Sequence, residues 1–217
     1  MSYLRGNCLL KPYKARFFPK HMIKLNLGSG WRNFGKDWIH IDGGNYPHVK
    51  YHDIIKLQFD DGSVDLIYAS HVFEYFDREE GKDVLKEWYR VLKPGGILRI
   101  AVPDFEAMAK LYSNGKFPLK NFLGPLYGKM EMGMRGGETG KIIYHKTVYD
   151  FKDLKKLLEE IGFNNVRKYD WKITPPHDKF DDHSQSYLPH EGFVPTPEKP
   201  FDKETGYLIS LNVEADK

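Results

Sequence analysis

Two patterns of apolar and polar positions follow one another along the chain. Short apolar runs, some alternating with polar residues and others nearly continuous, are typical of β-strands. In the first third of the chain such runs predict four strands, at 22–27, 37–42, 48–54 and 63–70. The last of them, SVDLIYAS, is so continuously apolar that we expect a strand buried on both faces.

Helical spacing then replaces this pattern. Five apolar residues between 79 and 93 share one helical face: Val84, Leu85, Trp88, Val91 and Leu92. The sequence KPGG at 93–96 should end this helix, and ILRIAVP at 97–103 predicts a fifth strand. A second helix is expected around 104–113.

The last third of the chain predicts one more helix and two more strands. The helix should have Thr147 as its N-cap and end at Gly162. The strands, at 165–173 and 206–215, are joined by a loop without a helix, which favours an antiparallel pair. Strands that alternate with helices indicate an α/β fold around a largely parallel sheet.

The length of 217 residues suits a single domain. We expect one domain over 1–217 with three additions. They are a basic and aromatic N-terminal cap at about 1–21, a glycine- and methionine-rich lid at about 114–144, and a proline-rich irregular loop at about 174–205. The lid and the loop should shape the acceptor pocket, and the lid should be mobile without ligand.

Charge and cysteine content narrow the class of protein. The 33 Lys and Arg residues against 30 Asp and Glu residues leave a net charge of +3, too little to indicate a nucleic-acid partner. The single cysteine, Cys8, cannot form an intramolecular disulfide. Neither a signal peptide nor a membrane-length apolar stretch is evident. We therefore expect a cytoplasmic protein that binds a small molecule and no membrane, with its oligomeric state open.

The turn Gly28-Ser29-Gly30 is the first candidate binding feature. It follows the first predicted strand, and Asp42 ends the second. Ligands of open parallel sheets bind at the carboxyl ends of the strands. There the glycines would let an adenosine-containing cofactor approach, and the Asp42 carboxylate would accept hydrogen bonds from its ribose hydroxyls. A plain turn explains the glycines equally well when they are taken alone.

The spacing around this turn disfavours a dinucleotide. The dinucleotide fingerprint needs a third glycine, and Asn33 stands in its place. Only residues 31–36 separate the turn from the next strand, which leaves room for about one or two helical turns. The first crossover should therefore be short or irregular, and a cofactor without phosphate fits better.

Taken together, these segments resemble the class I S-adenosylmethionine-dependent methyltransferases, and more narrowly a bacterial and viral group of small methyltransferases. The resemblance rests on five stretches in this order: LNLGSG, WIHID, HDIIKLQFDDGSVDLIYASHVFEYF, LKEWYRVLKPGGILRIAVPD and ISLNVEA. It implies S-adenosylmethionine as the cofactor. It also implies a Rossmann-like, mostly parallel seven-stranded sheet with helices on both faces and an antiparallel last strand.

The same resemblance implies which residues meet the cofactor. They are Asn26, Gly28, Ser29, Gly30, Asp42, Asp53, Ile54, Ala69, Ser70 and His71. The glycine turn would face the methionine part, Asp42 the ribose, and Asp53 with the backbone of Ile54 the adenine. The end of the fourth strand would lie below the sulfonium.

Two positions depart from the pattern of the family. Asn26 stands where many relatives have an acid, which removes a negative charge near the ammonium group of the cofactor. Tyr75 stands where relatives commonly place a histidine after a glutamate. Both departures bear on the individual cofactor contacts.

Three residues are candidates for catalysis. His145 follows the lid, and an unperturbed histidine pKa near 6.5 suits a general base, although a solvated loop histidine is the alternative. Asp104 could reach the acceptor or cap the next helix. His71 could face the cofactor or bond locally.

A further group of residues has the side chains that metals prefer. It consists of His177, Asp178, Asp181, Asp182 and His183. Their spacing matches no ligand template, and such residues in a proline-rich loop are usually solvated, so no metal is expected.

The expected function is methyl transfer to a small-molecule or saccharide acceptor, at a hydroxyl oxygen, as in glycan modification. The many tyrosines and tryptophans suit a sugar face, and the fourth strand ends in ASHV and not in the NPPY-type sequence associated with methylation of base amino groups. The alternatives are a non-catalytic cofactor-binding regulatory subunit and an N-methyltransferase of a small metabolite. A nicotinamide-dependent oxidoreductase is disfavoured by the missing glycine.

Overall fold

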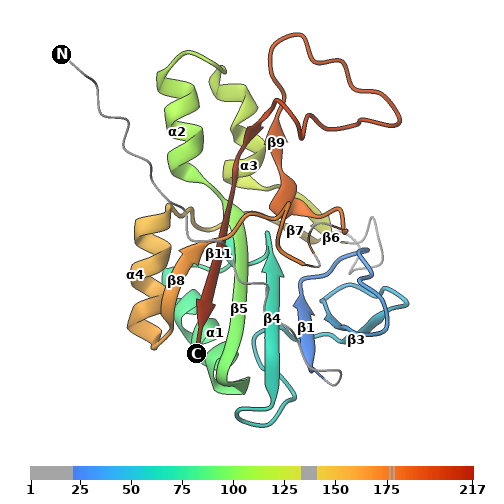
Figure 1. Cartoon of the computed structure of the whole chain (residues 1–217), viewed down its shortest axis with the longest axis vertical. Helices are drawn as coiled ribbons and strands as arrows, with labels where there is room; N and C mark the ends of the chain where they lie inside the picture. Colours follow the sequence, from blue (N-terminus) through green and yellow to red (C-terminus); the bar gives the residue numbers. More distant parts are fainter. Residues whose placement is uncertain (1–21, 133–140, 176, 178) are drawn as a thin grey trace, which may run out of the picture.

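The computed structural model describes residues 22–132, 141–175, 177 and 179–217. The N-terminal cap with Cys8 and residues 133–140 of the lid lie outside this part. A seven-stranded sheet forms the centre, in the order β3-β2-β1-β4-β5-β11-β8 (Figure 1). Its strands are β1 (Lys24–Leu27), β2 (Ile39–Ile41), β3 (Val49–Tyr51), β4 (Val64–Ser70), β5 (Leu92–Pro103), β8 (Asn164–Lys168) and β11 (Ser210–Asp216).

Strand directions confirm the mostly parallel sheet. The strands β1 to β5 pair in parallel, and β11 runs antiparallel to both β5 and β8. The predicted KPGG stop belongs to β5, which bulges there: Val64 pairs with Leu92, and Leu66 already pairs with Ile97. The loop-linked last strands are antiparallel, as expected.

Four α-helices and three short 3₁₀ turns occur in the described residues. The helices are α1 (Arg78–Val91), α2 (Phe105–Ser113), α3 (Leu123–Tyr127) and α4 (Phe151–Ile161). The 3₁₀ turns are η1 (Phe73–Tyr75), η2 (Leu119–Asn121) and η3 (His183–Gln185). The helix α1 starts at a capping box that Asp77 and Glu80 form together.

The caps of α4 correct one prediction. Asp150, and not Thr147, caps its N-terminus and accepts a hydrogen bond from the backbone nitrogen of Asp153. Thr147 does not cap the helix, because Tyr149 still forms a β-bridge with Asp104 and the helix begins only after it. Gly162 ends the helix in the left-handed conformation, as predicted.

Successive side chains of β4 point to opposite faces of the sheet, and both faces are buried. Ile67 and Ala69 belong to a large core that α1 and α4 cover, and these two helices contact each other. Leu66 and Tyr68 point to the opposite face, where they pack with Phe34. Thus irregular segments, at 28–38 and near Phe180, close the second face over β4.

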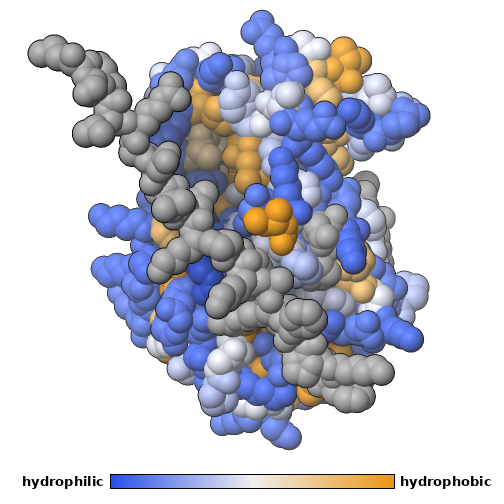
Figure 2. All heavy atoms as spheres, viewed as in Figure 1, coloured by the Kyte–Doolittle hydropathy of each residue, from blue (hydrophilic) through white to orange (hydrophobic). Residues whose placement is uncertain are grey.

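The predicted lid and loop contain short ordered elements. In the lid, β6 (Met130–Met132) pairs with β7 (Lys141–Ile143). In the C-terminal third, β9 (Tyr187–Leu188) pairs with β10 (Tyr207–Leu208). A third apolar cluster joins these parts, and its buried members are Met108, Phe122, Leu188 and Ile209. Apolar side chains are visible in the recess between α2 and β9 (Figure 2). Over the described residues, no helix has the length and apolar character needed to cross a membrane.

Candidate cofactor and active site

The glycine turn has both a structural and an open side. Gly28 has a φ of +65°, and a Cβ there would lie 2.6 Å from Cγ2 of Val72, so its small size serves packing. Gly30 has a φ of +55°, and a Cβ there would meet no heavy atom within 4 Å. The positive φ favours glycine at both positions, and an added Cβ would collide with a neighbour only at Gly28.

Asp42 is joined to this turn directly. Its Oδ2 accepts a hydrogen bond of 2.8 Å from the nitrogen of Gly30, and its Oδ1 accepts one of 2.7 Å from Gly44. His48 lies beside them, with Nε2 3.1 Å from the Gly30 carbonyl oxygen. The prediction that the turn and Asp42 meet is in accord with this geometry. His48 carried no recognisable signal in the sequence.

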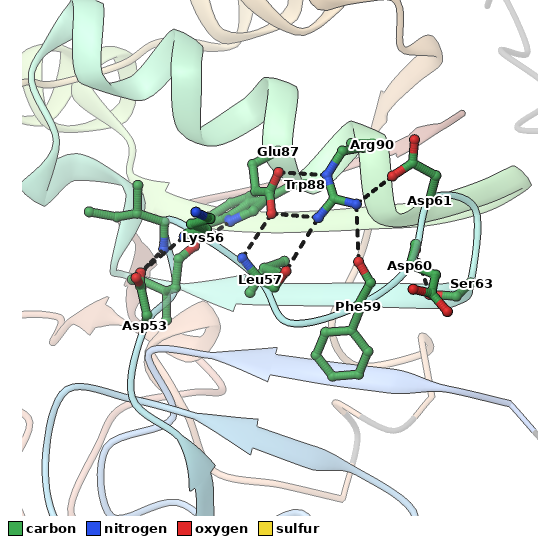
Figure 3. Close-up of polar contacts among 12 residues, drawn as sticks. Asp53, Lys56, Leu57, Phe59, Asp60, Asp61, Ser63, Glu87, Trp88 and Arg90 are labelled. Carbon is green, nitrogen blue, oxygen red and sulfur yellow. Dashed lines mark hydrogen bonds and ion pairs between the residues drawn. The ribbon is translucent and has the colours of Figure 1, made fainter.

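Asp53 lies at the start of a segment that side chains of α1 hold in place (Figure 3). Oδ1 of Asp53 accepts hydrogen bonds from the backbone of Ile55 and Lys56, and the Ile54 carbonyl accepts one of 2.8 Å from Nε1 of Trp88. Further along, Arg90 forms an ion pair with Glu87 and donates to the carbonyl oxygens of residues 57 and 59. These contacts fix the path of residues 53–59, whatever ligand lies beside them.

A shallow hollow opens at the carboxyl ends of β1 and β4. It is lined by Asn26, Gly28, Ser29, Arg32, Phe34, Tyr68, Ser70, Asp182 and His183. Four of these were predicted as cofactor contacts: Asn26, Gly28, Ser29 and Ser70. Its enclosed part measures about 10 Å³, which is room for about one water molecule, so the hollow as it stands holds no more than a fragment of a cofactor.

Two polar atoms beside the hollow are buried without a hydrogen-bond partner in the described structure. They are Nδ2 of Asn26 and Oγ of Ser70. Buried polar groups normally find partners, so such atoms in a hollow fit a site that a polar ligand completes. Ala69, in contrast, is fully buried in the core under α1, and only its backbone could meet a ligand.

Beyond Ser70, the chain places two predicted catalytic histidines around one buried carboxyl group. The side chain of Glu74 is 0% exposed. Its Oε1 lies 3.5 Å from Nδ1 of His71 and 3.6 Å from Nε2 of His145. His71 has a φ of +50°, an uncommon conformation for a residue with a side chain. Glu74 was not singled out from the sequence, because no local pattern indicates that His71 and the distant His145 meet at its carboxyl group.

The hydrogen bonds around this cluster set the tautomers of the histidines. Nδ1 of His145 lies 2.9 Å from the Pro125 carbonyl, which can only accept, so Nδ1 carries the proton and Nε2 presents a lone pair to Glu74.

Tautomer assignment for His71 follows a longer chain of bonds. The Asn212 amide donates to Ser184, so its Oδ1 accepts from the Ser210 hydroxyl. That hydroxyl must then accept from Nε2 of His71, 3.0 Å away. Nδ1 of His71 is therefore also a lone pair that faces Glu74.

These assignments agree with the electrostatics of the cluster. Burial raises the pKa of Glu74 to about 8. Burial lowers the pKa of His145, and burial together with neighbouring histidines lowers the pKa of His71. At pH 7 the three groups are thus a carboxylic acid between two neutral imidazoles.

Asp104 and the residues of metal-ligand type have local roles. Asp104 caps α2, because its Oδ1 accepts a hydrogen bond from Ala107. Asp181 accepts an ion pair from the Lys203 ammonium at 2.9 Å, and Asp182 caps η3. Asp178 lies outside the described residues, and the part of the chain that is described holds no group of three or more His, Cys, Asp or Glu placed to bind a metal.

Comparison with known proteins decides between the cofactor classes that this geometry allows. Residues 9–100 match the family model of a methyltransferase domain. Over these residues, which are less than half of its length, the chain is similar to methyltransferase domains. S-adenosylmethionine is the cofactor that this domain implies.

Curated relatives of the methyltransferase domain include two demethylmenaquinone methyltransferases. The protein from Staphylococcus haemolyticus is 31% identical over 132 residues, which are 57% of this chain and 50% of that protein. The protein from Staphylococcus aureus strain JH9 is 32% identical over 124 residues, which are 53% of this chain and 46% of that protein. The chain thus spans about half the length of the curated relatives it matches.

Solved structures share the fold of the methyltransferase domain. A SAM-dependent methyltransferase from Archaeoglobus fulgidus superposes with a TM-score of 0.51 at 16% identity, covering 90% of this chain and 86% of that one. A second, from Methanosarcina mazei, has a TM-score of 0.52 at 18% identity and covers 92% and 94%. At these identities the likeness concerns the fold alone.

The polar lining of the hollow fits the methionine part of this cofactor, because the unpartnered atoms of Asn26 and Ser70 are free to bond a polar ligand. Gly30 and Asp42 do not line the hollow and lie beside it, joined to each other by a hydrogen bond. The sequence did not single out Arg32, Phe34 or Tyr68. Asp182 and His183 had been noticed only as possible metal ligands.

Proposed function

We propose that this methyltransferase domain moves the methyl group of S-adenosylmethionine to an oxygen of a small-molecule acceptor. The observation that carries the proposal is the neutral cluster of Glu74, His71 and His145 next to the hollow at the end of β4. A hydroxyl group attacks well only if a base takes its proton, and neutral imidazoles can do so.

When bound, the cofactor supplies an activated methyl group, and the protein supplies alignment, a dry site and a proton acceptor. His183 lines the hollow, and its ring centre lies 5.3 Å from that of His71. Burial and the charge of Arg32 lower the pKa of His183 to about 4, so it is neutral at pH 7. The base is therefore to be sought among three histidines, of which His183 is nearest to the hollow.

His145, our first candidate from the sequence, has both ring nitrogens directed into the protein. One faces Pro125 and the other faces Glu74. In this arrangement neither ring nitrogen of His145 is open to an acceptor, and the same holds for His71, whose nitrogens face Ser210 and Glu74. Asp104 is better assigned to the cap of α2 than to the acceptor.

Two acceptor classes have support. A saccharide hydroxyl suits the tyrosine- and tryptophan-rich composition. An apolar acceptor, of the kind named for the staphylococcal relatives, suits the exposed apolar side chains of the lid, which include Leu119, Leu123, Tyr127, Ile142 and Tyr144.

The test is transfer of a labelled methyl group to a panel of hydroxylated saccharides, demethylated quinones and amines. We expect transfer to oxygen-bearing acceptors, at a rate that rises with pH in the acidic range and levels off by pH 7, where the histidines are already neutral. Transfer to amines alone would refute an oxygen acceptor. Binding of the cofactor without any transfer would favour the regulatory alternative.

A further inference from the structure

The methionine part of the cofactor carries a positive ammonium group and a negative carboxylate. A site that binds both needs an anion and hydrogen-bond donors within one hollow. On β1 the position that faces the hollow is Asn26, which is neutral and only 3% exposed. The strand itself therefore supplies no negative charge.

Asp182 lines the same hollow, although it lies far away in the sequence. It is 5% exposed, and its Oδ2 accepts a hydrogen bond of 2.8 Å from the hydroxyl of Tyr68. Tyr68 on β4 is the register partner of Asn26 on β1, so both side chains point to the same face of the sheet. The hydroxyl of Tyr68 thus binds Asp182, and Tyr68 lies directly beside Asn26 in the sheet.

The surroundings of Asp182 keep it ionised. Burial alone would raise its pKa, but its contacts with His177, Ser184 and Tyr68 outweigh burial and hold the pKa below its usual value. His177 has a pKa lowered by burial, so it is neutral at pH 7. Among the described ion pairs, Asp182 has this histidine and no lysine or arginine. A buried carboxylate without a cation is costly, and a cationic ligand would compensate it.

Asp182 also has acceptor capacity left. Oδ1 accepts from the backbone of Ser184 at 2.7 Å and Oδ2 from Tyr68, whereas a carboxylate offers about four lone-pair positions. The carboxylate of the cofactor needs donors or positive charge. Nδ2 of Asn26 is an unpartnered donor, and Arg32 brings positive charge to the same hollow.

We infer that Asp182 binds the ammonium group of the cofactor and that Asn26 donates to its carboxylate. The negative charge absent from β1 is in this way supplied by the C-terminal loop, next to η3. The inference rests on the proposed use of S-adenosylmethionine and adds a residue to its site.

The test compares S-adenosylhomocysteine with the analogue that lacks its amino group, by calorimetry. Asp182→Asn keeps the shape of the side chain and an acceptor for Ser184 but removes the charge. We expect it to weaken S-adenosylhomocysteine about tenfold to a hundredfold, because hydrogen bonds to charged groups are among the strong ones. The deaminated analogue should bind the variant and the wild type equally well.

Asp181→Asn is the matched control, because Asp181 is the exposed neighbour and pairs with Lys203. It should change neither affinity. In the double variant Asn26→Asp, Asp182→Asn, the carboxylate returns to β1, and we expect most of the affinity for S-adenosylhomocysteine to return with it.

Equal weakening of both ligands by Asp182→Asn would show a merely structural role and overturn the inference. Unchanged binding of S-adenosylhomocysteine would do the same. If Asp182→Asn does not fold, the wild type decides: equal affinity for the two ligands would exclude recognition of the ammonium group. A wild type that binds neither ligand would instead refute the proposed function.

Discussion

The buried carboxyl group of Glu74 makes a quantitative prediction about stability. Its pKa is about 8 in the folded protein and about 4.5 when exposed, so folding favours the protonated form. A raised pKa contributes stability that is fully present below pH 4.5 and is lost as the pH rises through 8. The loss begins at half slope at pH 4.5, reaches about 1.4 kcal/mol per pH unit above pH 5, and amounts to about 3 kcal/mol by pH 7.

Glu74→Gln removes this titration and keeps the shape. The glutamine amide is neutral at every pH and offers N–H donors toward the lone pairs of His71 and His145. The variant should therefore match the wild type below pH 4.5 and be about 3 kcal/mol more stable at pH 7. The lowered pKa values of His71 and His145 reduce the stability of the wild type and of Glu74→Gln alike as the pH falls. Their effect therefore largely cancels in the stability difference between the two proteins.

Urea denaturation between pH 5 and pH 8 measures this difference. It should grow by about 1.4 kcal/mol per pH unit between pH 5 and pH 7. Glu79→Gln on the exposed start of α1 is the control and should give no such slope. A flat difference for Glu74→Gln would mean that the carboxylate is ionised in the folded protein, and the proton assignment of the cluster would be wrong.

Three further predictions concern the glycine turn, the ribose and the base. Gly28→Ala should lower the free energy of unfolding by about 1–3 kcal/mol, because the position has a positive φ and the new Cβ would meet Val72. If Gly28→Ala costs less in a Val72→Ala background than in the wild type, the contact with Val72 is confirmed, and equal costs in the two backgrounds would exclude it. Asp42→Ala should weaken S-adenosylhomocysteine by about 1.5–3 kcal/mol in calorimetry, and unchanged affinity would remove Asp42 from the cofactor site. His145→Ala and His183→Ala, compared in single-turnover assays at saturating cofactor, should slow methyl transfer by about 10²–10⁴-fold for the residue that is the base, and His145→Ala should leave cofactor affinity intact. A variant that transfers at the wild-type rate across the pH range would exclude its histidine.

The features that sequence predicted well depend on neighbours in the chain. The apolar run of β4, the helical stripe of α1 and the glycine turn after β1 each carry their signal within a few residues. The short crossover before β2 followed from simple counting, and Asp42 followed from its place at a strand end. Local periodicity and turn chemistry suffice for these elements.

The remaining site residues come together only in the folded chain. Tyr68 and Asp182 are 114 positions apart, and His71 meets Ser210 across 139 positions. Asp182 was recognised as a charged residue of an irregular loop, but no local pattern says that the loop folds over β4. Glu74 stood in an unremarkable FEY sequence, and its raised pKa arises from burial among segments that the chain supplies later.

The place of β11 in the sheet has a kinetic consequence. The strand lies between β5 and β8, and β8 has β11 as its sheet neighbour. The parallel pairs of β1, β4 and β5 close over shorter stretches of chain than the pair of β5 with β11, whose partners include Ser210 and Pro103. Contacts between distant residues form slowly, because the loop must be closed before they stabilise it. We therefore expect the N-terminal half of the sheet to form first during refolding, and β8 to become protected from hydrogen exchange only together with β11.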